Sequence, residues 1–316
     1  MSRDQIIKIA MVVCVVVLLC AVIITSTGMF GGSGIGGYAD AEKYTSGDTD
    51  ITDEIRNLDI HWTAGKVTVA YRAGSKVTLR ETAKRQLSDD EKLQWWMDGD
   101  TLRVQFTKPG IRWNMPEKEL TITLPEGIEL KQAGIHTTSG DIEIPAMKVE
   151  ELLVLDSTSG DIRAAAEARN AEINATSGAQ TIQLSGEADI VRINSTSGDI
   201  SAEAEKAAIF EVASTSGGIA MKAAECGEAK ANSTSGKILV DLGKLEKLNI
   251  GATSGDVTVK LPEEPGFTAS VHTTSGEFTN GIALTRDGSR YVCGDGSAQV
   301  NIDTTSGSVH LEATEK

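Results

Sequence analysis

Apolar and polar residues alternate on both sides of a Thr-Ser-Gly triplet that occurs nine times in this chain of 316 residues. Apolar side chains recur seven and five residues before the triplet glycine, and again two residues after it. A period of two is typical of a β-strand with one buried face. The nine triplets end at Gly140, Gly160, Gly178, Gly198, Gly217, Gly236, Gly255, Gly276 and Gly307.

The triplets recur at intervals of 18 to 21 residues, apart from a last interval of 31. Such recurrence predicts one structural unit stacked on copies of itself. Each unit is expected to contain a strand, a corner at the triplet, a second strand, and a variable return segment such as 164–170 or 202–208. Stacked units place parallel strands about 4.8 Å apart. The sequence therefore predicts an all-β fold, a parallel β-solenoid (β-helix) of about ten or more rungs, with a period near 19 residues.

The corner residues have a structural explanation. Glycine allows a backbone conformation that a Cβ atom disfavours, and stacked Thr and Ser hydroxyls can hydrogen-bond along their columns. One repeat departs from the pattern, because Gln180 stands two residues after Gly178, where the other repeats have an apolar residue. Ile182 follows two positions later, so we expect this repeat to be shifted by two residues.

A degraded repeat precedes the regular ones. Its apolar residues and its glycine have the same offsets as in the later units, with Thr63-Ala64-Gly65 at the corner and Asp98-Gly99 as a hairpin signal further on. A solenoid end needs an atypical unit to cover its core. We interpret residues 54–132 as irregular N-terminal rungs with a cap, filled mainly by the four tryptophans, and residues 133–312 as the regular repeats, before a short tail (313–316). The residues of the degraded repeat are Leu58, Ile60, Gly65, Val67 and Val69, and the tryptophans are Trp62, Trp95, Trp96 and Trp113.

The N-terminal segment predicts membrane attachment. Residues 6–25 are apolar apart from Lys8 and Thr25, which is long enough for a single transmembrane helix. A small-x-small cleavage site does not follow it, which favours an uncleaved anchor over a signal peptide. Basic residues precede the segment, so residues 1–5 are expected in the cytoplasm and the repeats outside it, in a protein of the cell membrane. Residues 26–53, rich in Gly, Ser and Asp, are expected to form a flexible linker.

The net charge argues against one class of partner, and the positions of the cysteines argue against a disulfide framework. The formal net charge of −15 and the lack of a basic stripe oppose binding of nucleic acid. Cys226 and Cys293 are expected about three rungs apart, or roughly 14 Å, which is too far for a disulfide bond. We therefore expect no nucleic-acid partner and no disulfide framework.

The chain has few candidates for chemistry. His136 and His272 share an offset but lie in distant repeats, and no pair of histidines has the spacing of metal ligands. Acidic residues follow several triplets, yet other residue types interrupt this series, so a solvated edge is expected there. No motif of a nucleophile or of a phosphate-binding loop occurs. We predict no catalytic residue, no metal site and no cofactor. The histidines are His61, His136, His272 and His310, and the acids are Asp141, Asp161, Asp199, Asp256 and Glu277.

The interval from Gly276 to Gly307 exceeds a regular rung by 12 residues and contains Arg286-Asp287-Gly288 and Gly294-Asp295-Gly296. Long excursions from a rigid scaffold can carry binding residues. Here we favour an insertion that covers the final rung.

The segment LDIHWTAGKVTV at 58–69, the stretch ITLPEGIEL within 121–130 and the recurring TTSGDI units resemble the DUF4097 family of β-strand repeat proteins, whose members are also labelled as candidate adhesins. The resemblance covers about residues 54–312. It implies a bacterial protein with one N-terminal anchor and an extracytoplasmic repeat domain, and it supplies no catalytic residues.

Three functions remain open from the sequence. The first is a non-catalytic surface module that binds or adheres to an unknown protein or glycan ligand. The second is an envelope signalling or stress-response component that works with a membrane partner. The third is a carbohydrate-active β-helix enzyme, which requires Asp141, Asp161 and Asp199 to converge with Arg163 or Arg192.

Overall fold

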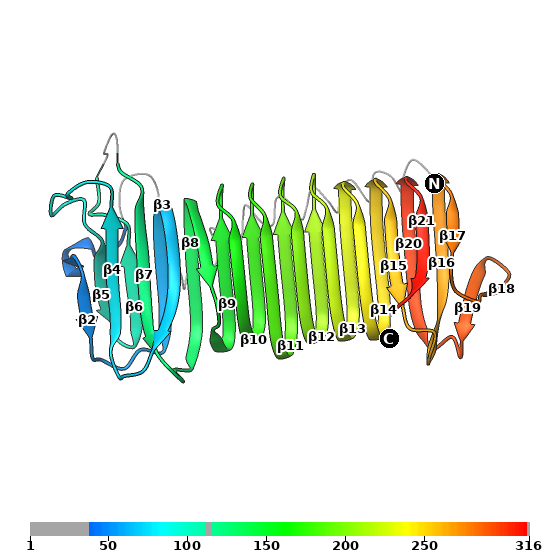
Figure 1. Ribbon diagram of the computed structural model, residues 1–316, viewed down its shortest axis with the longest axis horizontal. Helices are drawn as coiled ribbons and strands as arrows, with labels where there is room; N and C mark the ends of the chain where they lie inside the picture. Colours follow the sequence, from blue (N-terminus) through cyan, green and yellow to red (C-terminus); the bar gives the residue numbers. More distant parts are fainter. Residues whose placement is uncertain (1–37, 111–114, 315–316) are drawn as a thin grey trace. The chain divides into compact units, whose positions relative to one another are not determined.

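The computed structural model describes residues 38–110 and 115–314, in which the chain is all-β apart from one 3-10 turn, η1 (Ala41–Lys43). These residues form two compact units, here called the first unit (up to Gly178) and the second unit (from Ala179 on). Figure 1 shows both units as stacks of long parallel strands. The expected transmembrane helix at 6–25 and the expected cytoplasmic residues 1–5 lie outside the described residues.

Within residues 38–110 and 115–314, the structure contains no helix with the length and apolar character needed to cross a membrane.

The first unit contains ten strands and the irregular part of the sequence. Its regular rungs begin with β8, which carries the first full triplet. The strands are β1 (Thr45–Ser46), β2 (Thr49–Ile51), β3 (Asn57–Arg72), β4 (Val77–Ala83), β5 (Gln94–Asp98), β6 (Thr101–Gln105), β7 (Lys118–Pro125), β8 (Leu130–Ile144), β9 (Lys148–Ser157) and β10 (Ile162–Ala175).

Strand β3 is the degraded repeat predicted from the sequence. It pairs in parallel with β8, so that Gly65 lies opposite Gly140, and its other edge pairs in parallel with β6 and β7. Antiparallel strands complete this end of the unit, since β4 pairs with β7 and β5 with β6 across the Asp98-Gly99 hairpin. Parallel and antiparallel pairings are therefore mixed at this end of the unit.

The second unit contains the remaining repeats. Its strands are β11 (Gln180–Ser195), β12 (Ile200–Ser214), β13 (Ile219–Ser235), β14 (Ile238–Ser254), β15 (Val257–Leu261), β16 (Gly266–Ser275), β17 (Phe278–Asn280), β18 (Thr285–Asp287), β19 (Arg290–Gly294), β20 (Ala298–Ser306) and β21 (Val309–Ala313).

The return segments of the repeats are strands, which corrects the expectation of variable connections. Residues 164–170 belong to β10 and residues 202–208 belong to β12. In β12 the alanines Ala202, Ala204 and Ala207 are buried, while the glutamates between them are exposed. Alanine therefore fills the core on this side of the rung, and the strand bends without leaving the parallel ladder.

The expected two-residue shift at Gln180 is wrong. Gln180 lies opposite Ile200, and Ile182 lies opposite Ala202, so the register of this repeat is the same as that of its neighbour. The Gln180 side chain is 1 % exposed, and its Nε2 donates to the carbonyl oxygen of Asn194 at 2.8 Å. A hydrogen bond inside the core makes a buried amide tolerable, whereas a shifted repeat would lose its ladder bonds.

Close backbone packing explains most of the triplet glycines. A Cβ atom on Gly217 would lie 2.1 Å from the carbonyl oxygen of Gly198, and one on Gly236 would lie 2.1 Å from that of Gly217. Neither of these glycines has a positive φ, in contrast to Gly255 at 133°. The glycines of successive rungs therefore form a column in which a side chain has no room, and backbone conformation is a secondary reason for their presence.

The hydroxyl that closes the corner belongs to the residue before the triplet. The hydroxyl oxygens of Ser157, Ser195 and Ser214 accept from the triplet glycine N–H at 2.8–2.9 Å, and these serines are buried. Along the column, backbone hydrogen bonds join one corner to the next, as from Ser159 N–H to the Thr138 carbonyl oxygen at 2.9 Å.

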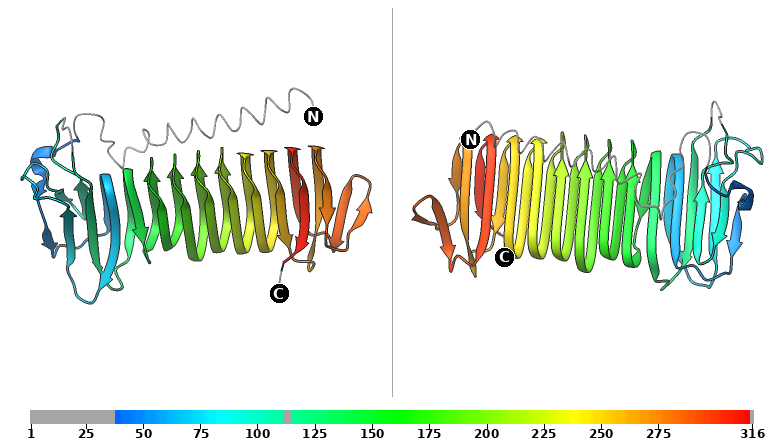
Figure 2. Two further views of the ribbon diagram at one scale, coloured as in Figure 1. Left: turned by 45° about the horizontal axis from the view of Figure 1, so that its top comes forward. Right: turned by 180° about the vertical axis from the view of Figure 1, so that it is seen from behind.

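The last repeat in the sequence is not the last rung in space. Strand β20 pairs in parallel with β14 on one edge and with β16 on the other, so the repeat of Gly307 lies between those of Gly255 and Gly276. Figures 1 and 2 show β20 and β21 within the stack, and the β18–β19 hairpin beyond β16. Strand β19 pairs antiparallel with β16, so the long excursion covers the outermost rung, as predicted, while the order of the rungs differs from the order of the repeats.

Candidate functional site

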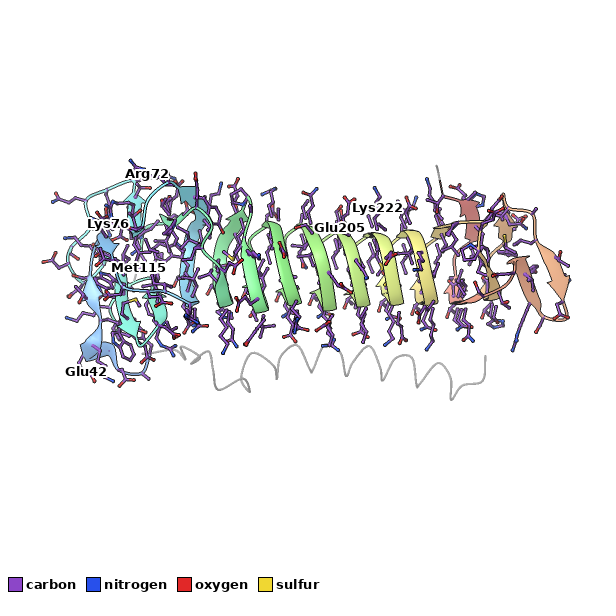
Figure 3. All side chains as sticks on the ribbon, turned by 90° about the horizontal axis from the view of Figure 1, so that it is seen from below. Glu42, Arg72, Lys76, Met115, Glu205 and Lys222 are labelled. Carbon is purple, nitrogen blue, oxygen red and sulfur yellow. The ribbon has the colours of Figure 1, made fainter. Side chains whose placement is uncertain are left out.

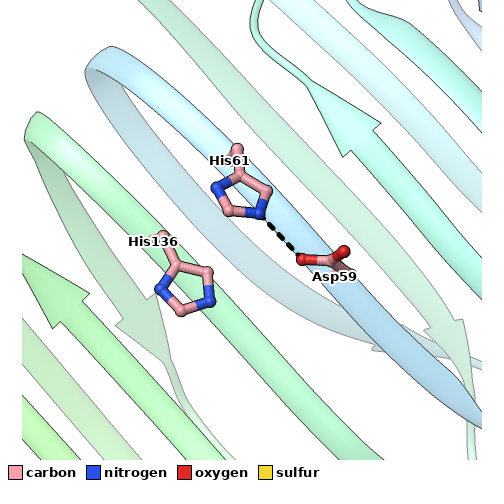
Figure 4. Close-up of side chains that lie close together, drawn as sticks. All are labelled: Asp59, His61 and His136. Atoms are coloured by element: carbon pink, nitrogen blue, oxygen red, sulfur yellow. Dashed lines mark ion pairs between the residues drawn. The ribbon is translucent and has the colours of Figure 1, made fainter. Parts of the chain in front are cut away.

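Two histidines of the first unit stack on each other across neighbouring strands. His61 on β3 lies opposite His136 on β8, with ring centroids 4.8 Å apart and an interplanar angle of 17°. Figure 4 shows both rings beside the carboxylate of Asp59. The pair arises because both residues stand four positions before a corner glycine, so parallel pairing in register brings them together.

The carboxylate of Asp59 lies at the inner end of this pair. Its Oδ1 is 2.9 Å from His61 Nε2, yet neither of these two buried atoms makes a hydrogen bond. The other carboxylate oxygen pairs with Arg103 of β6, which lies opposite Asp59, and Arg103 Nε also bonds Asp98 at 3.1 Å. Arg103 therefore fixes one oxygen of Asp59, while the other faces the imidazole.

A second carboxylate orients His136. Its Nδ1 lies 2.8 Å from Asp156 Oδ2 on β9, and Asp156 Oδ1 accepts from Asn174 Nδ2 at 2.9 Å. These residues follow His136 in register across β9 and β10. The hydrogen bond engages Nδ1, so Nε2 is the nitrogen of His136 that can bind a ligand.

The side chains of this cluster differ in their exposure to solvent. The side chain of Asp59 is 2 % exposed, that of His61 13 %, and those of His136 and Asp156 20 % and 18 %. The carboxylate of Asp59 is thus in the interior, and the imidazole edges reach solvent. Tyr44 adjoins the same group, with its ring 5.7 Å from that of Trp96, and burial raises the pKa of its phenol despite a hydrogen bond with Gln105.

Asp59, His61 and His136 together form a group that could hold a metal ion, with one ligand atom from each residue and all three atoms within 4.8 Å of one another. The sequence argument missed this group because it judged pairs of histidines by their spacing along the chain and noted a shared offset only for His136 and His272. The available signal was the degraded repeat itself, since His61 and His136 have the same offset from Gly65 and Gly140.

A buried lysine lies elsewhere in the cap. The Lys118 side chain is 0 % exposed, its Nζ lies 2.9 Å from Glu81 Oε2, and it donates to the carbonyl oxygens of Glu91 and Phe106. The ammonium also lies over the rings of Trp62 and Phe106, at 5.0 and 4.3 Å from their centroids. Burial lowers the pKa of Lys118, and Glu81 opposes this shift. The Lys118 ammonium therefore links β7 to Glu81, Glu91 and Phe106 in the interior of the cap.

The acids that follow the triplets serve the backbone. Asp141 Oδ1 accepts from the N–H of Asp161 at 2.9 Å, and Asp161 pairs with Arg163 at 2.8 Å. In the second unit, Asp199 Oδ1 accepts from the N–H of Gly218 at 2.8 Å. Arg192 pairs instead with Glu211, at 2.9 Å. Asp141 and Asp199 therefore each tie one rung to the next, whereas Asp161 pairs within its own rung, and these contacts give the enzyme hypothesis no acid–base pair at these positions.

Charges of alternating sign form columns on the second unit. Glu187, Lys206, Glu225 and Lys244 follow one another in register, and their ion pairs measure 3.0, 3.8 and 3.5 Å. Figure 3 shows side chains such as Glu205 and Lys222 projecting from these strands. Such columns cancel their own charge locally.

A shallow groove lies on the same unit over β11–β14, beside the triplet corners. Its volume is about 340 Å³. Thr181, Ser201, Ala220 and Leu239 follow one another in register along it, and Leu239 is 41 % exposed. The groove therefore combines hydroxyl and apolar positions on a rigid surface.

The remaining candidates from the sequence are two cysteines and two histidines. Cys226 and Cys293 are free and buried, and burial raises the pKa of Cys226 to about 12, which leaves the thiol protonated and unreactive. His310 pairs with Glu312 at 2.9 Å, and His272 is exposed.

A family of known repeat proteins matches most of the chain. The model of the family described as Toastrack DUF4097 matches residues 55–312. A solved structure of a candidate adhesin from Bacteroides fragilis is 14 % identical, with 84 % of this chain and 97 % of that chain covered and a TM-score of 0.39. A candidate cell adhesion protein from Clostridium sporogenes is 13 % identical, with 85 % and 100 % covered and a TM-score of 0.21. Among curated proteins, none matches the chain.

Proposed function

Since the chain belongs to the Toastrack DUF4097 family, we propose that it is a non-catalytic binding module, displayed outside the cell and tethered by residues 6–25. The groove over β11–β14 supports this proposal best. It is open and shallow, it lies on strands held rigid by parallel pairing, and Leu239 offers an apolar anchor beside small side chains. The candidate adhesins among the similar structures are in keeping with such a role.

A protein ligand fits this groove better than a glycan. Sugars commonly stack on aromatic rings, and the residues that line the groove include no aromatic side chain. Leu239, which is exposed beside Ala220, suits an apolar side chain of a partner, with polar contacts at the rim. The proposed ligand is therefore a protein of the cell surface.

The test uses residues 31–316 with Leu239→Ser in the groove and Lys244→Ser as a control. Lys244 lies outside the groove, and its side chain is 73 % exposed. We expect the fragment to bind a surface protein in pull-down and to give no specific signal on a glycan array. Leu239→Ser should weaken that binding at least tenfold, and Lys244→Ser should leave it unchanged. Equal binding by both variants would exclude the groove as the contact surface.

A further inference from the structure

The geometry points to a divalent transition-metal site, of the kind that binds Zn²⁺, formed by Asp59, His61 and His136 in the first unit. We assign Asp59 Oδ1, His61 Nε2 and His136 Nε2 as the ligand atoms, and one donor atom from each of the three residues lies within 4.8 Å of the others. Two imidazole nitrogens and one carboxylate oxygen are a donor set that favours Zn²⁺ over Mg²⁺ or Ca²⁺, which prefer oxygen ligands alone.

Two of the ligand atoms face each other without a hydrogen bond. Asp59 Oδ1 and His61 Nε2 are buried and lie 2.9 Å apart as an ion pair, yet neither makes a hydrogen bond. Buried polar atoms of this kind are rare in folded proteins because lost hydration is costly. An ion between them would satisfy both atoms at once.

The outer contacts are those that a metal site requires. A ligating histidine commonly donates its other N–H to a carboxylate, which fixes the tautomer and increases the basicity of the ligand. Asp156 holds this position on His136 Nδ1, and Arg103 holds the second oxygen of Asp59. The residue of β8 that lies opposite Asp59 is Gly134, so β8 places no side chain beside the carboxylate.

Charge also favours a dication. Asp59, Asp98 and Asp156 carry three negative charges, and Arg103 supplies one positive charge to the same network. With both imidazoles neutral, the formal charge of the cluster is −2, which one Zn²⁺ would neutralise. The two imidazole side chains are 13 % and 20 % exposed, so the cluster lies close to solvent.

The side chains must rearrange around the ion. Zinc bonds to nitrogen and oxygen are about 2.1 Å long, so two ligand atoms of a tetrahedral site lie about 3.4 Å apart. Ligand atoms that are now up to 4.8 Å apart must approach by about 1.4 Å, whereas Asp59 Oδ1 and His61 Nε2, now 2.9 Å apart, must separate by about 0.5 Å. Three protein ligands leave a fourth position for water or an exchangeable ligand.

The test measures Zn²⁺ bound per chain by equilibrium dialysis, with the full-length chain purified in detergent without a histidine tag. We expect one ion per chain, a rise in thermal stability with Zn²⁺ that a chelator reverses, and the visible absorption of tetrahedral cobalt when Co²⁺ replaces Zn²⁺. His61→Ala and His136→Ala should each weaken binding more than 100-fold. Asp156→Asn should weaken it about 10–100-fold, as expected of an orienting carboxylate.

His272→Ala is the matched control, since His272 has the same repeat position in the second unit and is exposed. It should bind Zn²⁺ as the unchanged chain does. The proposal is overturned if the unchanged chain binds no ion or gives an octahedral cobalt spectrum. It is equally overturned if the His61→Ala/His136→Ala double variant retains binding. Should an alanine variant misfold, two measurements still test the proposed metal site. They are the cobalt spectrum of the unchanged chain and Zn²⁺ binding by the conservative Asp59→Asn variant.

Discussion

The rungs β11–β14 of the second unit and the strands around β3 in the first unit share one backbone geometry but use their side chains differently. In β11–β14 most buried residues lie beside other apolar residues, so aliphatic columns fill the interior, and alternating charges cover the exterior. Around β3 the neighbours differ, because β6 and β8 have unrelated sequences. Arg103, Asp59 and His136 then meet within a few ångströms.

The comparison shows where a repeat protein can acquire chemistry. A column of similar residues can be apolar, hydroxylated or alternately charged, and each arrangement serves stacking. A site with different ligands needs different residues on adjacent strands. In this chain that condition is met where the repeat is degraded, and the candidate site lies there.

The largest effect is expected from a charge in an aliphatic column. Ile193 on β11 is 0 % exposed, so Ile193→Asp should lower the free energy of unfolding by about 5 kcal/mol or prevent folding, since a buried charge without a partner is costly. Thr181→Asp, at an exposed position of the same strand, should cost less than 1 kcal/mol (about the limit for surface changes). Chemical denaturation measures both, and equal values would mean that Ile193 does not face the core.

The second prediction removes the buried positive charge of Lys118 in the cap. Lys118→Met should destabilise the first unit by about 3–4 kcal/mol, because Glu81, 6 % exposed, would then lack its counter-ion. Adding Glu81→Gln should recover part of this loss, since a neutral amide is less costly to bury and can still accept from the Leu93 N–H. A double variant no more stable than the single one would contradict a role for the ion pair.

Close packing at the corners predicts a contrast between adjacent glycines. Gly217→Ala should cost about 2–3 kcal/mol, because the new Cβ would lie 2.1 Å from the Gly198 carbonyl oxygen. Gly218→Ala should cost little, because the nearest atom is the carboxylate oxygen of Asp199 at 3.4 Å. Thermal melting of the two variants compares them directly. If both tolerate alanine equally, the glycine column has another origin.

The smallest effect belongs to the exterior charges. Burial acts to raise the pKa of Glu211, but hydrogen bonds from Lys230 and Arg192 outweigh it and hold the pKa below the usual range. A lowered folded-state pKa stabilises the protein above the ordinary value of 4.5, and that stability is lost as the pH falls through the folded-state pKa. Glu211→Gln should therefore cost about 0.5–1 kcal/mol at neutral pH and nothing in strong acid. An unfolding series across pH measures the difference, and a cost independent of pH would contradict it.

The period of two predicted the parallel stack because buried positions such as Ile193 and Ile250 recur at fixed offsets from the triplet. The same pattern failed at Gln180, since periodicity counts an amide as polar and cannot register its hydrogen bond to Asn194. The place of the last repeat was also hidden, because similar repeats fit equally well in either order along a stack. Stacking of His61 on His136 was predictable from their shared offset, whereas the approach of Arg103 and Asp156 depends on register between dissimilar strands.

The position of β20 between β14 and β16 bears on how the chain is made. A polypeptide leaves the ribosome from its N-terminus, so each earlier rung can settle on a finished neighbour. The slot beside β14 is filled last, by residues 298–313, after β16 and its hairpin have already emerged. A nascent chain that stops short of these residues would leave two open strand edges facing each other, and such edges attract other chains. The second unit is therefore complete only when residues 298–313 have paired between its neighbouring rungs.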